Sequence, residues 1–214
     1  MKRRTWLDDA ARKRFAETIA AIESKTSAEV VVTVRERSSS YRHVDLAVGA
    51  LFALAVLVVY IYAPLVFDDG LAVPSVVLAF VGGAFLASAL DVPKRLFVRA
   101  KERQSVVTTA ARAAFVEQGI ASTRDRTGIL VYVSLLENAV AVVTDIGVDP
   151  KVMGEPWTNA MRRLEACAAG GATPAAVAEA LLAFGEPLEL ALPRREDDVN
   201  ELPDEVVASA EESV

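Results

Sequence analysis

Residues 127–150 read TGILVYVSLLENAVAVVTDIGVDP and carry the clearest structural signal in the chain. Two runs rich in β-branched side chains, 129–136 and 139–145, flank a short Glu-Asn turn, so the stretch predicts two strands joined tightly. The second run ends on Asp145. Its carboxylate is either a functional group at the rim of a sheet or a polar residue that ends a strand.

An earlier apolar run predicts a third strand. Residues 29–35 read EVVVTVR, and the central VVVTV is apolar on both faces, as in a sheet covered by helices. A single strand of this kind cannot bury both faces, so it must join the later pair. The expected fold class is α/β, a small three-layer sandwich with a central sheet of three to four strands covered by helices.

Helical periodicity surrounds these strands. Apolar side chains recur at helical spacing in residues 7–25, 101–120, 156–170 and 174–185. These four segments are the helices expected to cover the sheet.

Individual residues mark the ends of the expected helices. Gly119 fits a left-handed cap after the second helix. Pro156 is expected to open the third helix, and Thr173 to cap the start of the fourth. Gly185 is expected to end the fourth helix.

Two long apolar segments lie between the first strand and the second helix. Residues 46–67 and 71–90 contain no charged side chain, and only Asp-Asp-Gly connects them. Each is long enough, at roughly 1.5 Å per residue, to cross the hydrocarbon core of a bilayer. The sequence therefore predicts a two-helix transmembrane hairpin, with lipid as the partner of residues 46–90.

The distribution of charge predicts the orientation of the hairpin. All 23 lysines and arginines lie outside residues 46–90, and basic residues flank the hairpin on both sides. By the positive-inside rule, both flanks lie in the cytoplasm and the turn lies outside. We expect an integral protein of the cell (inner) membrane, with both termini and the globular domain cytoplasmic.

The hairpin splits the predicted domain into two parts. Residues 1–40 form its first part, 41–98 the hairpin, 99–190 the remainder, and 191–214 an acidic disordered tail.

Composition excludes several classes of function. The net charge of −6 and the lack of a basic face argue against nucleic-acid binding. One cysteine, Cys167, and one histidine, His43, are too few for a disulfide, a zinc site or a Cys/His catalytic pair. Small residues in the hairpin favour packing between its two helices over dimerisation, although a homo-oligomer stays open.

The ordered set of motifs resembles the TPM domain family, found in thylakoid-lumen, photosystem-repair and receptor-modulator proteins. The resemblance rests on IAAIESKTSAEVVVTV, on AARAAFVEQGI with TRDRTGILVYVSLLENAVAVVTDIGV, and on AMRRLEACAAGGATPAAVAEALLAF. It covers roughly residues 7–36 and 103–185. It implies a three-layer α/β domain with acidic residues at one sheet edge and, for some members, divalent-cation binding and weak acid-phosphatase activity. A hairpin inside the domain and a cytoplasmic location depart from that pattern.

The loop DIGVDP after the last strand is the candidate metal site. Its carboxylates Asp145 and Asp149, with Glu29 or Glu137, could lie near one sheet edge. Calcium and magnesium prefer several oxygen ligands of this type. The alternative is an ordinary strand-ending turn.

The preceding loop, STRDRT, is the candidate phosphate or anion site. Arg124, Arg126 and Thr127 supply donors that neutralise a phosphate ester. The alternative is a plain solvated loop. No catalytic residue is identified, because no serine or cysteine has a plausible neighbouring base and no cofactor motif is present.

Two functions follow from these features. The first is a membrane-anchored interaction or accessory module that binds a protein partner at the membrane. The second is a metal-dependent, acid-phosphatase-like hydrolase of phosphomonoesters. We favour the first, because one loop carboxylate without an acid or base partner seldom supports catalysis.

Overall fold

The computed structural model describes residues 5–6, 8–63, 69–90, 94, 100–171, 173–195 and 200–202. The chain divides into two compact units. One contains residues 1–39 and 103–214, and the other contains residues 40–102.

The first unit contains a mixed three-stranded sheet. Its strands are β1 (Glu29–Arg35), β2 (Gly128–Ser134) and β3 (Ala139–Thr144), in the order β1-β2-β3. β1 pairs with β2 in parallel and β2 pairs with β3 antiparallel. The prediction of an α/β fold in which the early strand joins the later pair is confirmed.

Helices accompany the sheet within the same unit. They are α2 (Asp9–Glu23), α6 (Ala100–Glu117, which starts in the other unit), α7 (Pro150–Ala169), α8 (Pro174–Leu181) and α9 (Gly185–Ala191), with the short 3-10 helices η2 (Ile120–Ser122) and η3 (Leu182–Phe184).

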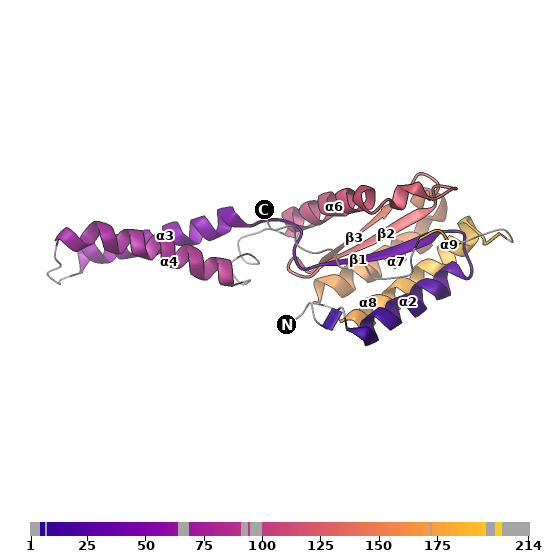
Figure 1. Cartoon of the computed structure of the whole chain (residues 1–214), viewed down its shortest axis with the longest axis horizontal. Helices are drawn as coiled ribbons and strands as arrows, with labels where there is room; N and C mark the ends of the chain where they lie inside the picture. The colour runs from indigo at the N-terminus through magenta and orange to yellow at the C-terminus, as the bar shows by residue number, and fades with distance from the viewer. Residues whose placement is uncertain are drawn as a thin grey trace. The chain divides into compact units, whose positions relative to one another are not determined.

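Apolar clusters lie on both faces of the sheet. On one face, Val30, Val32 and Val34 pack in a cluster with side chains from α2, α7, α8 and α9. On the other face, Val31 and Leu130 pack with side chains from α6. Figure 1 shows α6 on one side of the strands and α2 and α8 on the other. The unbroken valine run of β1 is therefore explained, because successive side chains point to opposite, equally covered faces.

The expected helix faces are correct where the structure describes them. Phe15, Ile19 and Ile22 of α2 are buried, as are Val107 and Ala111 of α6. The marked helix ends are also present. Gly119 has a φ of 67°, and the Thr173 side chain accepts a hydrogen bond from the N–H of Ala176.

One expected helix end is confirmed in part, and another is wrong. α7 begins at Pro150, where the Asp149 side chain caps a first turn, but Gly154 has a non-helical backbone, and Pro156 lies in the first turn of the helix that follows this kink. Gly185 does not end the last helix. It has right-handed helical angles and starts α9, so the chain stays helical to Ala191.

The start of the predicted disordered tail is also corrected. Residues 192–195 lie beside the segment around Thr26. The hydroxyl of Thr26 donates a hydrogen bond to the carbonyl of Leu192 over 2.6 Å. Thr26 and Pro193 form an isolated β-bridge. These residues therefore pack on the α/β domain, as Leu202 also does, and residues 196–199 and 203–214 lie outside the described part.

The second unit contains two long helices, α3 (Arg42–Tyr62) and α4 (Ala72–Ala89), with the 3-10 helix η1 (Asp69–Leu71) between them. Within the described residues, both are long and apolar enough to cross a membrane by length and composition. Only 11% of the apolar window of each helix is buried.

Small residues lie where α3 and α4 pack against each other. Gly49 is buried, and a Cβ atom there would lie 2.7 Å from the carbonyl oxygen of Phe80. Gly83 is buried too, and its Cβ would lie 2.9 Å from the Cβ of Phe52. These glycines therefore permit close packing within the hairpin.

Candidate functional site

The predicted cation ligand Asp145 forms an ion pair with the predicted anion ligand Arg126. The Nε of Arg126 lies 2.7 Å from Oδ2 of Asp145, and Nη2 lies 2.9 Å from Oδ1. The backbone N–H of Ile146 also donates to Oδ1, over 2.7 Å. Both carboxylate oxygens therefore accept strong hydrogen bonds from the protein itself.

The antiparallel pairing of β2 and β3 brings this pair together. Asp145 directly follows β3, and its N–H donates to the carbonyl of Gly128 at the start of β2. Arg126 lies two residues before β2 and has a φ of 57°. This left-handed backbone conformation is uncommon for residues other than glycine and persists only where surrounding contacts hold it. The carbonyl of Arg126 in turn accepts a hydrogen bond from the N–H of Gly147, over 2.9 Å.

The ion pair sets the protonation state of Asp145. The hydrogen bond from Arg126 lowers the pKa of the Asp145 carboxyl, and the N–H of Ile146 and the guanidinium charge act in the same direction. Burial opposes them, since Asp145 is only 5% exposed. Asp145 raises the pKa of the half-exposed Arg126. The pair is therefore fully ionised at neutral pH.

A pH dependence of stability follows from the lowered pKa of Asp145. The contribution of ionised Asp145 to the free energy of unfolding is complete above the ordinary carboxyl pKa of 3.8. It is lost as the pH falls through the lower pKa of the folded state. The urea midpoint of Asp145→Asn should therefore lie below that of the wild type at pH 7. The gap should narrow below about pH 4, near the unperturbed carboxyl pKa.

The measurement is urea unfolding of the detergent-solubilised full chain, followed by the fluorescence of the buried Trp6 and Trp157. Arg126→Met should lose the same acid-dependent component. A gap between wild type and Asp145→Asn that is constant from pH 7 to pH 3 would contradict the assignment.

The other predicted metal ligands have separate partners. Asp149 caps α7, and its Oδ1 accepts from the N–H of Lys151 over 2.9 Å. Glu29 is buried at the start of β1, and its Oε2 accepts from the N–H of Leu202 over 3.4 Å. Among the residues that the structure describes, no group of three or more His, Cys, Asp or Glu side chains could hold a metal ion. A cation at Asp145 would meet the positive charge of Arg126 bonded to both carboxylate oxygens, and calcium or magnesium binding stays a prediction.

The remaining residues of the predicted anion site shape the loop. Thr127 is buried, and its N–H donates to the side chain of Thr123 over 3.1 Å. The backbone N–H of Arg124 donates to Oε2 of Glu201 over 2.8 Å. A carboxylate from the C-terminal segment therefore lies against this loop, which the sequence did not indicate.

Glu137 lies at the other end of β2 from Asp145 and belongs to a separate buried network. Its carboxylate accepts hydrogen bonds from the N–H of Ser38 and the hydroxyl of Ser134. The Ser38 hydroxyl donates to that of Ser134 over 2.7 Å. Burial raises the pKa of the neighbouring Tyr132 phenol. Serines within a loop and at a strand end gave no sequence signal for this network.

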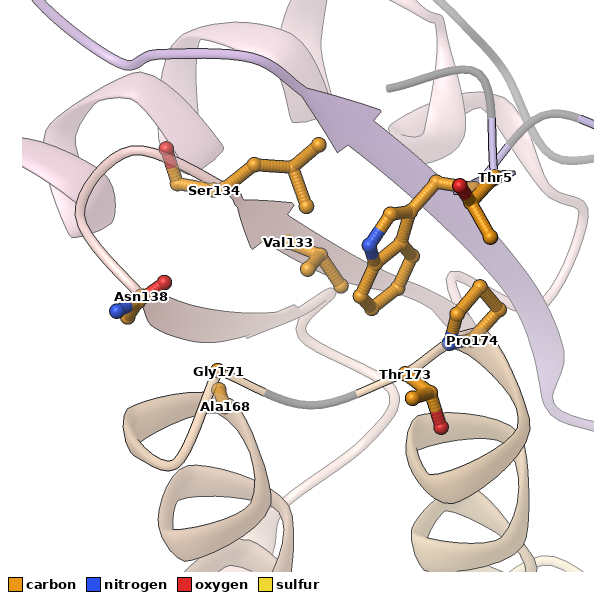
Figure 2. Close-up of a pocket in the computed structure, with 10 residues that line it drawn as sticks. Thr5, Val133, Ser134, Asn138, Ala168, Gly171, Thr173 and Pro174 are labelled. Carbon is orange, nitrogen blue, oxygen red and sulfur yellow. The ribbon is translucent and has the colours of Figure 1, made fainter. Parts of the chain in front are cut away.

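A cavity of about 200 Å³ lies at this end of the sheet, between Trp6, Val133 and Pro174. Figure 2 shows the hydroxyl of Ser134 directed away from the other lining side chains. None of the described lining residues is charged. The cavity therefore offers apolar contacts but no acid or base from those residues.

Comparison with known proteins shows similarity of fold. No protein-family model matches the chain, and no curated protein matches it. The chain is similar to the solution NMR structure of the BA42 protein from the psychrophilic bacterium Bizionia argentinensis sp. nov.. That likeness has a TM-score of 0.58 at 16% identity and covers 95% of this chain and 96% of the other. At this identity the likeness extends to the fold alone, and the resemblance to the TPM domain stays a prediction.

Proposed function

We propose that the chain is a membrane-anchored interaction or accessory module whose α/β domain faces the cytoplasm. The observation that carries this proposal is the exposed apolar surface of α3 and α4. Leu78 and Phe85 of α4 are 72% and 74% exposed, and Ile61 of α3 is 64% exposed. Soluble monomers rarely expose contiguous apolar surface on this scale, whereas a bilayer covers it.

The finer architecture is part of the same proposal. Apolar clusters on both faces of the sheet support a three-layer sandwich, with α6 in one outer layer and α2, α7, α8 and α9 in the other. Because the hairpin has two spans, both parts of this domain can fold together on one side of the membrane.

The ion pair at the sheet edge bears on the alternative function, the metal-dependent hydrolase. Arg126 and the N–H of Ile146 already bond both oxygens of Asp145. The metal-dependent hydrolase gains no observation in its favour from this arrangement and stays a prediction.

Cysteine labelling tests the anchor and its orientation. In a Cys167→Ser background, Asp69→Cys places a thiol in the turn between the apolar helices, and Glu165→Cys places one on the exposed side of α7. In spheroplasts, a membrane-impermeant maleimide should label Asp69→Cys directly and Glu165→Cys only after permeabilisation.

The unlabelled Cys167→Ser chain serves as the blank. Labelling of both positions without permeabilisation, or the reverse pattern, would contradict the cytoplasmic orientation. Release of the full chain by alkaline carbonate would contradict the anchor.

A further inference from the structure

The C-terminal segment Asn200–Leu202 lies against the loop of residues 121–127. Oε2 of Glu201 accepts a hydrogen bond from the backbone N–H of Arg124 over 2.8 Å. The N–H of Leu202 donates to Oε2 of Glu29 over 3.4 Å. The N–H of Arg124 therefore binds the carboxylate of Glu201, and the carboxylate of Glu29 binds the N–H of the next residue, Leu202. A Glu-Leu pair supplies both groups in this order.

Leucine is the apolar element of this contact. Leu202 packs against the cluster that covers the α6 face of the sheet, and Ala121 packs against the same cluster. The exposed Arg124 suits an acidic segment, whereas Arg126 and Asp125 of the same loop are paired with Asp145 and Arg195. A positive charge at Arg124 favours encounter with acidic chains, and apolar burial at Leu202 adds affinity.

Residues 194–195, which precede this segment in the chain, also contact the domain. Nη1 of Arg195 lies 2.8 Å from Oδ2 of Asp125, a pair whose side chains are 65% and 47% exposed. The N–H of Arg194 donates to the carbonyl of Lys25 over 3.2 Å. Attachment at residues 194–195 keeps the nearby Glu-Leu pair at high effective concentration, in the millimolar range typical of short linkers.

We propose that residues 121–127 and Glu29 form a docking site for an acidic segment with a Glu-Leu pair in a partner protein, and that Glu201 and Leu202 occupy it in cis. The site recognises one carboxylate, one main-chain N–H and one leucine side chain. A partner that carries the same chemistry competes with the chain's own segment, so the C-terminal segment limits access. This inference rests on the proposed interaction function and assigns the class of partner and its regulation.

A fluorescent peptide of residues 198–205, DVNELPDE, tests the proposal by anisotropy with the full chain in detergent. The double substitution Glu201→Arg and Leu202→Asp should open the site. We expect the peptide to bind this opened chain at least ten-fold more tightly than the wild type. Adding Ala121→Asp to the opened chain should abolish binding, because it places a negative charge against the apolar cluster on which Leu202 packs.

A scrambled peptide of the same composition is the control, and it should not bind. Fluorescence of Trp6 and Trp157 verifies that each variant is folded. No peptide binding to a folded, opened chain would overturn the docking site, as would equal binding of the scrambled peptide or after Ala121→Asp. Equal affinity of wild-type and opened chains would overturn occupancy in cis. Failure of the membrane-anchored function would instead appear in the cysteine labelling, independently of the peptide result.

Discussion

Gly147→Ala should lower the free energy of unfolding of the α/β domain by about 3 kcal/mol, near the upper end of the cost of overpacking. A Cβ at Gly147 would lie 2.5 Å from the carbonyl oxygen of Asp125 and 2.6 Å from that of Arg126. Both are backbone atoms and cannot move like the end of a flexible side chain. The turn after β3 would have to separate from the loop before β2.

The damage should extend to the ion pair at the sheet edge. The N–H of Gly147 donates to the carbonyl of Arg126, and this bond helps to hold the left-handed backbone of Arg126 in place. If the turn moves, the guanidinium of Arg126 no longer lies within hydrogen-bond distance of the Asp145 carboxylate. Gly147→Ala should therefore also lose the acid-dependent component of stability that Asp145→Asn removes.

Gly185→Ala is the matched control. A Cβ there meets no atom within 4 Å, and the backbone has right-handed helical angles. Alanine should leave the domain unchanged or stabilise it by about 0.5–1 kcal/mol, because it restricts the unfolded chain. Urea unfolding with tryptophan fluorescence measures both variants, since Trp6 and Trp157 are the two tryptophans and both are in the domain. Equal midpoints for the two substitutions would contradict the close approach at Gly147.

The strands could be predicted from sequence because their burial is continuous. β1 and β2 are apolar on both faces, and a tight turn separates β2 from β3. The pairing of β1 with the later strands follows from burial, because a single strand could not bury both of its apolar faces. The helix ends at Gly119 and Thr173 were predictable because each depends on one local conformation.

The errors have a different origin. Gly185 has helical angles because Phe184 and Leu188 on either side are buried in the same core cluster, so tertiary packing overrides the local tendency of glycine to end a helix. The first turn of α7, at Pro150, depends on the cap from Asp149, which was interpreted as a metal ligand because it lies four residues after Asp145 in one loop. Residue type could not separate a capping carboxylate from a ligating one.

The candidate site was predictable in its parts but not in its arrangement. Asp145 and Arg126 were each identified, one for a cation and the other for an anion, although they are 19 residues apart and bond to each other. The predicted hairpin could have indicated this pair, because antiparallel strands place the residue before one strand beside the residue after the next. The contact of Glu201 with Arg124 spans 77 residues and had no comparable signal.

Gly49→Leu should separate the two apolar helices. A Cβ at Gly49 would lie 2.7 Å from the backbone oxygen of Phe80 and 3.1 Å from the Cβ of Ala84. Helices in a bilayer associate largely through such close packing, because lipid removes the hydrophobic drive that operates in water. Gly82→Leu is the matched control, since a Cβ at Gly82 meets nothing within 4 Å.

Disulfide formation across the hairpin measures this separation. In a Cys167→Ser background, Phe52→Cys and Gly83→Cys place two thiols where a Cβ at residue 83 would lie 2.9 Å from that of Phe52. After a small outward shift this pair is within the usual range for a disulfide. Mild oxidation in membranes should link the pair, and Gly82→Leu should leave the yield unchanged. Gly49→Leu should reduce the yield by about ten-fold, equivalent to roughly 1.4 kcal/mol of helix association. An unchanged yield in Gly49→Leu would show that α3 and α4 do not depend on the approach at Gly49, and that small residues in this hairpin serve another surface.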